Sequence, residues 1–170
     1  MSEQNLQDNR NYIGVICYWL PLLAYAMTIA LVSSLSSPKV HLDVLANVFL
    51  SGPIDIFGKI NDKIYHIVTY TILGLLTYRA IRFSWGEKLG PFAAFIAVTA
   101  VALYGITDEF HQWFVPFRNV ETWDLIADTF GGLIGVSLWE WALTIAPIRQ
   151  LEEQLPIKLQ LLKNTIASEK

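Results

Sequence analysis

The sequence predicts an all-α integral membrane protein, a bundle of four transmembrane helices that forms one domain. Composition is the first reason, because the 170-residue chain is 54% hydrophobic and only 16% charged, with a mean hydropathy of +0.41. A water-soluble domain carries more polar surface than this. The second reason is a series of apolar runs, each close to bilayer length. The net charge of −3 offers no basic surface for nucleic acid, so we expect no nucleic-acid partner.

The first predicted span follows a polar stretch, residues 1–10, which we expect to be a cytoplasmic tail. The apolar run from Asn11 to Leu35 exceeds the roughly 7–15 residues of a signal-peptide core, so it predicts a retained span. Pro21 should kink this helix or be accommodated by a neighbour. Cys17 is the single cysteine and cannot form an internal disulfide.

Three more spans are predicted after a short intervening segment. Residues 40–50 are too short to cross a bilayer, and their apolar spacing fits either an interfacial helix in the first outer loop or a loop folded over the bundle. The second, third and fourth spans run from about Lys63 to Phe83, from Pro91 to about Phe114 and from Asp124 to Ala146. Each is near the ~20 residues that a bilayer requires.

Basic residues outside the spans predict the orientation in the inner (cytoplasmic) membrane. With four spans in residues 11–146, the N-terminus, the loop 79–90 and the tail 147–170 share one side. That side holds eight basic residues: Arg10, Arg79, Arg82, Lys88, Arg149, Lys158, Lys163 and Lys170. The other side holds four: Lys39, Lys59, Lys63 and Arg118. Both termini are therefore expected in the cytoplasm, and the C-terminal tail is expected to form a surface helix or a frayed end.

Polar residues at the start of the second span predict part of a functional site. Asp62, His66 and Tyr70 recur at four-residue spacing, so they lie on one face of a helix. Asp62 also suits an N-cap, because the first N–H groups of a helix lack partners. His66 needs a hydrogen-bond partner at this depth, and a purely structural histidine remains the alternative.

The outward end of the third span carries Asp108, Glu109 and Gln112, with Arg118 in the following loop. Helix capping does not explain these carboxyl groups, because a helix C-terminus disfavours negative charge. A metal, a cationic partner or one protonated carboxyl group would explain them. Arg118 is the simplest partner, and the resulting network either locks the loop or binds an anion through the guanidinium.

The fourth span begins with Asp124 and Asp128, again four residues apart, followed by Gly131 and Gly135. This GxxxG spacing indicates close helix packing, which would bring Asp128 against Asp62 and His66 or against Asp108 and Glu109. The cluster lacks the HExxH spacing of a zinc site. We therefore expect no metal and no cofactor.

Together these motifs resemble the VanZ-like family of small bacterial membrane proteins. The resemblance covers roughly residues 60 to 136 and rests on Asp62-Lys63-x-x-His66 with Tyr70 and Gly74, Asp108-Glu109-x-x-Gln112, Pro116-x-Arg118, and Asp124 with a glycine-rich fourth span. The family usually has glycine where this chain has Phe117, and asparagine where it has Asp128. The resemblance implies a cell-envelope location. It also suggests a link to antibiotic resistance, because the family is named for a protein linked to low-level resistance to the glycopeptide teicoplanin.

The leading functional hypothesis is an outward-facing polar site that binds or acts on an anionic envelope component, such as a lipid-linked or cell-wall phosphate. Arg118 and Lys63 would hold the anion, and Glu109 or Asp108 would act as general acid or base. His66 would relay protons with Asp62 orienting it, and the remaining contacts would come from Gln112, Asp124, Asp128 and Tyr70. The alternative is a non-catalytic membrane module whose polar residues form a structural network for partner binding. A transporter would need oligomerisation.

Overall fold

The computed structural model describes residues 15–34, 55–115 and 122–168, and every regular element in these ranges is helical. The elements are η1 (Val15–Trp19), α2 (Leu20–Ser33), α4 (Asp55–Leu89), α5 (Phe92–Gln112), α6 (Thr122–Ala142) and α7 (Ala146–Ser168). The all-α prediction is confirmed for this part of the chain. The predicted interfacial segment, residues 40–50, lies outside the described residues.

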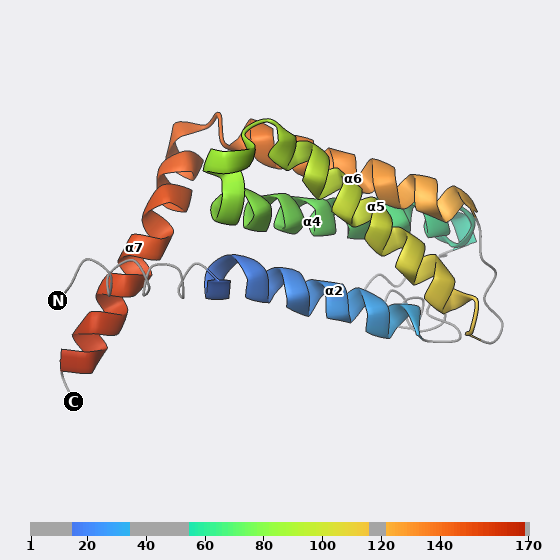
Figure 1. Cartoon of the computed structure of the whole chain (residues 1–170). Helices are drawn as coiled ribbons and strands as arrows, with labels where there is room; N and C mark the ends of the chain where they lie inside the picture. The colour runs from blue at the N-terminus through green and yellow to red at the C-terminus, as the bar shows by residue number, and fades with distance from the viewer. Residues whose placement is uncertain (1–14, 35–54, 116–121, 169–170) are drawn as a thin grey trace.

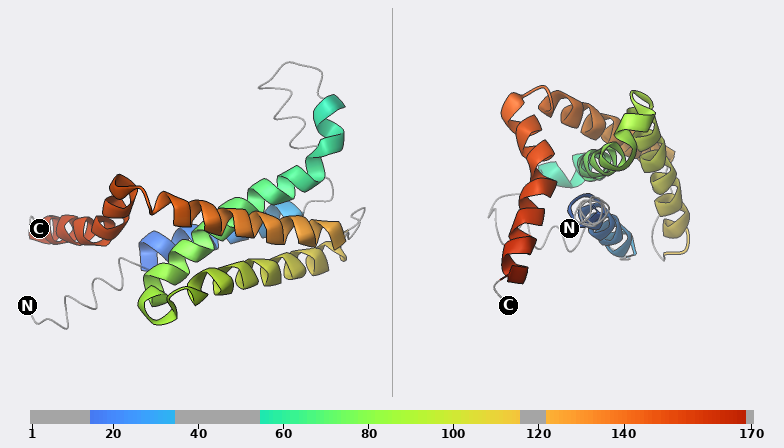
Figure 2. Two further views of the ribbon diagram at one scale, coloured as in Figure 1. Left: turned by 90° about the horizontal axis from the view of Figure 1, so that it is seen from above. Right: turned by 60° about the vertical axis from the view of Figure 1, so that its left-hand side comes forward.

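Four helices run lengthwise beside one another, and α7 crosses them at one end (Figure 1). The start of α2, the end of α4 and the end of α6 lie near α7, whereas the start of α6 and the end of α5 lie at the far end (Figures 1 and 2). The polar residues of the predicted site therefore gather at the end of the bundle opposite α7.

Two helices are long and apolar enough to cross a membrane, namely Val15–Ser33, which joins η1 to α2, and Phe92–Gln112. A third span is reached if α6 is joined to the beginning of α7, although the two are bent by 98°. The residues that the structure describes therefore contain two to three candidate membrane spans, and the predicted count of four is not confirmed. α4 is not among them, because its sequence mixes apolar residues with Lys63, His66 and other polar groups.

Two helix boundaries differ from those of the expected spans, and each lies beside a proline, Pro147 or Pro21. The fourth helix ends at Ala142 rather than Ala146, because α7 begins at Ala146 with Pro147 in its first turn. Pro21 likewise lies in the first turn of α2, directly after the π-helical turn η1. A proline is tolerated there because the first N–H groups of a helix have no partner within the helix. The C-terminal segment is thus a helix, as one of the two alternatives predicted.

Glycines bring α4 and α6 into backbone contact. A Cβ on Gly131 would lie 2.5 Å from the Ile67 carbonyl oxygen, and one on Gly74 would lie 2.5 Å from that of Gly132. A Cβ on Gly135 would meet the Thr71 carbonyl oxygen at still closer range. The close packing predicted from the GxxxG spacing is confirmed, and the second helix is the one that approaches.

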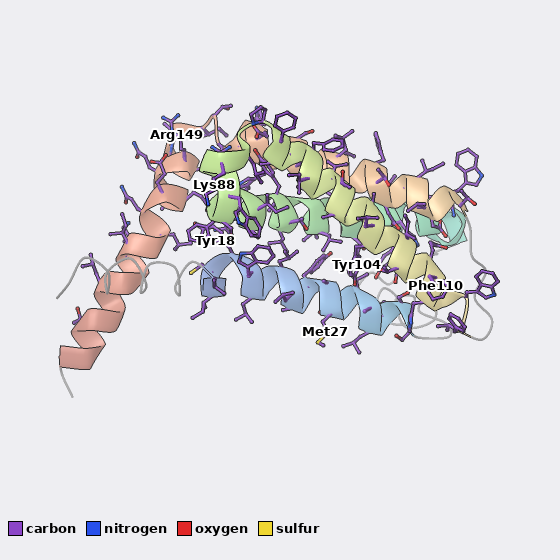
Figure 3. All side chains as sticks on the ribbon, in the orientation of Figure 1. Tyr18, Met27, Lys88, Tyr104, Phe110 and Arg149 are labelled. Atoms are coloured by element: carbon purple, nitrogen blue, oxygen red, sulfur yellow. The ribbon has the colours of Figure 1, made fainter. Side chains whose placement is uncertain are left out.

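The helices α5 and α2 complete the bundle in different ways. α5 packs small residues inward, including Ala93, Ala97 and Gly105. α2 is joined by tyrosines: the Tyr104 hydroxyl donates to the Ala26 carbonyl oxygen at 2.6 Å, and the Tyr25 hydroxyl donates to that of Thr69 at 3.3 Å. Tyr104 is labelled on α5 in Figure 3. These bonds satisfy the hydroxyl groups away from water.

A partly buried ion pair joins α7 to the bundle. The Arg79 guanidinium of α4 donates to both carboxylate oxygens of Glu152, at 2.6 and 2.8 Å. Its Cζ also lies 4.8 Å from the ring centroid of Tyr18 and 5.3 Å from that of Trp139. The Tyr18 hydroxyl donates to the backbone oxygen of Glu152 at 3.2 Å. We call Arg79, Glu152, Tyr18 and Trp139 the α7 clamp.

Replacing Glu152 by alanine is expected to destabilise the docked position of α7 by about 1.5–3 kcal/mol, the usual contribution of hydrogen bonds to a charged group. The matched control is Glu140→Ala. Its carboxylate lies 3.7 Å from Arg82 with both side chains about half exposed, so we expect a change of about 0.2–1 kcal/mol. Spin-label distances between α4 and α7 should broaden for the first variant only, and equal broadening would contradict a clamp role.

Candidate functional site

One face of α4 supplies three successive partners for carboxyl groups on its neighbours. Lys63, His66 and Tyr70 are spaced i, i+3 and i+7, which places them on one side of the helix. Lys63 contacts Asp124 of α6, His66 contacts Asp128 of α6, and Tyr70 contacts Asp108 of α5. We call these six residues, with Glu109 and Gln112, the polar cluster.

The pair His66–Asp128 lies deepest between α4 and α6. The Nδ1 of His66 is 2.7 Å from one carboxylate oxygen of Asp128, whose side chain has no exposed surface. The other oxygen, Oδ2, has no hydrogen-bond partner among the described residues. It faces Gly105 of α5, where an added Cβ would lie 2.9 Å from it. Only glycine leaves room for this carboxyl group between the three helices.

The second pair joins α4 to α5. The Tyr70 hydroxyl donates to Oδ2 of Asp108 at 3.4 Å, and the Gln112 amide donates to the same oxygen at 3.1 Å. Tyr70 also stacks on His66, with ring planes 17° apart and centroids at 6.2 Å. The buried carboxyl groups of Asp128 and Asp108 therefore contact two neighbouring rings, those of His66 and Tyr70, on the same face of α4.

The Lys63–Asp124 ion pair forms the outer rim of the polar cluster. The Lys63 side chain is 38% exposed while that of Asp124 is 4% exposed. Asp124 lies in the first turn of α6, where the unpaired N–H groups of the helix also favour a negative charge. Solvent therefore reaches the Lys63 side of the ion pair, whereas the Asp124 carboxylate is buried.

The structure brings together seven of the ten residues predicted for the site: Lys63, His66, Tyr70, Asp108, Gln112, Asp124 and Asp128. Glu109 is buried beside Asp108 on α5. Asp62 belongs to α4, but its side chain falls outside the described part of the structure, as does the whole of Arg118. The predicted orientation of His66 by Asp62 therefore stays a prediction, whereas the contact of His66 with Asp128 is observed.

Carboxyl groups outnumber basic groups in the polar cluster. Asp108, Glu109, Asp124 and Asp128 are all buried, and the basic side chains among the described cluster residues are Lys63 and His66, of which His66 is charged only when protonated. Buried carboxylates are costly unless they are paired or protonated. Within the described residues no group of three or more His, Cys, Asp or Glu side chains is arranged to hold a metal ion.

Two features of the site were not predicted. Gly105 looked like an ordinary residue of an apolar helix, yet it makes the space for Asp128. His111, adjacent in sequence to Gln112, is exposed, and its Nε2 lies 2.9 Å from the Ser34 hydroxyl at the end of α2. His111 lies three residues after Asp108, so helical spacing alone does not separate it from the buried Asp108 and Gln112.

The order and spacing of the polar residues on α4, α5 and α6 are those that suggested the VanZ-like resemblance, and a family comparison decides the matter. The family model VanZ/LLP1 matches residues 11–143, most of the chain. The chain belongs to the VanZ/LLP1 family. No curated protein and no solved structure matches it. The match of this VanZ/LLP1 protein includes all of η1, α2, α4, α5 and α6, and it stops before α7.

Proposed function

We propose that this VanZ/LLP1 protein binds an anionic component of the cell envelope at the polar cluster and carries out acid–base chemistry on it. The observation that supports the proposal best is the His66–Asp128 pair, buried in a membrane bundle beside a second carboxyl group, Asp108. Buried ionisable groups at this depth are expensive, and they usually mark a functional site.

Four spans with both termini in the cytoplasm are part of the proposal. α4 runs alongside α6 and turns its polar face inward, while Ile64, Tyr65, Val68 and Ile72 are exposed on its outer side. An outer side of this kind suits lipid, so α4 would span the membrane although its overall composition is mixed. The predicted excess of basic residues on the α7 side then orients the polar cluster outward.

The acid–base role rests on how His66 is held. A carboxylate on Nδ1 fixes the orientation of an imidazole and selects the tautomer that presents Nε2 to a reacting group. Asp128 occupies that position at 2.7 Å. Asp108, held by Tyr70 and Gln112, supplies a second carboxyl group in a different environment. Two such environments permit one group to donate a proton while the other accepts one.

The anion would enter at the rim, since the interior of the polar cluster is rich in carboxyl groups. Lys63 is the exposed cation there, and it is already paired with Asp124. Arg118, which lies outside the described residues, would provide the second positive charge from the adjoining loop. A guanidinium binds phosphate with two parallel hydrogen bonds, which suits a phosphate-bearing ligand.

Replacing Arg118 by glutamate should weaken binding of a polyprenyl phosphate to the purified protein by at least about tenfold, the loss expected for a charge-assisted contact of 1.5–3 kcal/mol. Arg118→Lys keeps the positive charge but not the two-pronged guanidinium, so its affinity should fall between those of the parent protein and Arg118→Glu. Binding is measured by titrating the lipid into the full-length protein in detergent. Unchanged affinity in Arg118→Glu would contradict the proposal.

The alternative, a structural network in a non-catalytic module, is favoured by a specific observation. Each of Lys63, His66 and Tyr70 already contacts a carboxyl group within the bundle. Thermal unfolding of the Arg118→Glu protein separates the two accounts. A ligand-binding arginine leaves the melting temperature unchanged when binding is lost, whereas a network member lowers the melting temperature together with binding.

A further inference from the structure

We propose that α7 lies in the surface of the bilayer, with one face in the lipid, and so anchors the end of the bundle opposite the polar cluster. The first reason is the direction of α7 relative to the other helices. α7 is bent by 98° from α6, and it crosses the end of the lengthwise helices (Figures 1 and 2). A helix perpendicular to membrane-crossing helices lies close to the membrane plane.

The α7 clamp provides the second argument, because it fixes the rotation of α7 about its own axis. Glu152 faces the bundle, where Arg79 holds both of its carboxylate oxygens. Helix positions i−4, i+3, i+7 and i+14 share the face of residue i. Counted from Glu152, these positions are Ile148, Leu155, Leu159 and Ile166. In helical register this side of α7 is therefore aliphatic at four positions, and Lys163, eleven residues after Glu152, is a basic residue on the same side.

This face leaves the bundle as α7 continues. Ile148 and Leu155 are partly buried, on either side of the clamp. Beyond them the helix runs past α2 (Figure 1). The side of α7 that meets protein near Glu152 must then meet the lipid surrounding the bundle. Leu151, one residue from the clamp, is already 63% exposed. Burial of such a face in the interface is how amphipathic helices bind membranes.

Charge gives the third argument. α7 contains the basic residues Arg149, Lys158 and Lys163, whereas its acidic residues are Glu152 and Glu153. Glu152 is neutralised by Arg79, which leaves three basic groups against one acid. Basic groups near an anionic membrane surface are attracted to it. The opposite face carries exposed Ile157 and Leu161 among polar residues, and a protein partner on that face is a competing outcome.

The test uses the full-length protein in liposomes of phosphatidylcholine with phosphatidylglycerol, in a Cys17→Ser background. Spin labels are attached at Leu155→Cys and Leu159→Cys on the aliphatic face, and at Glu153→Cys and Asn164→Cys as matched controls on other faces. Relaxation by oxygen, which concentrates in lipid, is compared with relaxation by a water-soluble nickel chelate. We expect the ratio of oxygen to nickel accessibility to be higher at 155 and 159 than at 153 and 164.

Three other results would overturn the inference. Equal, high nickel accessibility at all four sites would place α7 in water. Low accessibility to both reagents at 155 and 159 would mean that protein, not lipid, covers the face. Higher oxygen accessibility at 153 and 164 would mean that α7 is rotated the other way. The Glu152→Ala variant is expected to lose the contrast between faces, and retention of the contrast would refute the orienting role of the clamp.

Discussion

Replacing Asp128 by alanine is expected to destabilise the folded protein by about 3 kcal/mol, the cost of leaving one member of a buried pair without its partner. His66 would lose the carboxylate that lies 2.7 Å from its Nδ1. Asp128 is fully buried, so water does not reach the vacated position without opening the contact between α4 and α6. Unfolding of the purified protein in detergent, followed by tryptophan fluorescence, measures the loss.

Asp128→Asn is the matched control, because the amide has the same shape and keeps an acceptor for His66. It also restores the residue usual at this position in VanZ-like sequences. We expect its stability to remain within about 1 kcal/mol of the parent, since both hydrogen-bonding partners are retained. If the alanine and asparagine variants unfold alike, the contact with His66 does not stabilise the bundle, and the site geometry described above is wrong.

Replacing Gly135 by alanine is the second change with a large expected effect. The new methyl group would be forced against the Thr71 carbonyl oxygen and the Leu75 nitrogen, which are backbone atoms of α4. Overfilling a packed contact costs about 1–3 kcal/mol, and we expect the upper end because a helix backbone cannot rotate aside. The same unfolding measurement reports the loss of stability. The separation of α4 from α6 should also disturb the His66–Asp128 contact.

The control for Gly135 is Gly86→Ala on α4. The nearest atom to its added Cβ is the flexible Arg82 side chain at 3.2 Å, so little has to move. Alanine is also the better helix former by about 1 kcal/mol, so this variant should be neutral or slightly stabilised. Equal loss of stability in Gly86→Ala and Gly135→Ala would show that backbone contact between the helices is not the cause.

Much of the helical framework and the polar cluster could be predicted from local pattern. Apolar runs predicted the helices, and four-residue spacing placed Asp62, His66 and Tyr70 on one face of a helix before any partner was known. The GxxxG spacing anticipated that α6 would meet another helix closely, and α4 does so at Gly131 and Gly135. These signals are local, because each arises from residues within a few turns of one helix.

Pairings between helices were harder to predict, since they depend on how the helices are rotated against one another. The GxxxG spacing left two positions open for Asp128, against Asp62 and His66 or against Asp108 and Glu109, and the structure shows the contact with His66, 62 residues away in sequence. Lys63 was expected to hold an anion, and it lies against Asp124. The contacts of the α7 clamp could not be predicted from local sequence either, because Arg79 and Glu152 are 73 residues apart.

The proposed function requires that the polar cluster face outward from the membrane, with α7 on the cytoplasmic side. Thr122 is exposed at the start of α6, beside the cluster, and Glu153 is exposed on α7. In a Cys17→Ser background, Thr122→Cys should react with a membrane-impermeant thiol reagent in intact cells, whereas Glu153→Cys should react only after the inner membrane is permeabilised. The opposite pattern would place the polar cluster in the cytoplasm and contradict a role at an envelope component outside the inner membrane.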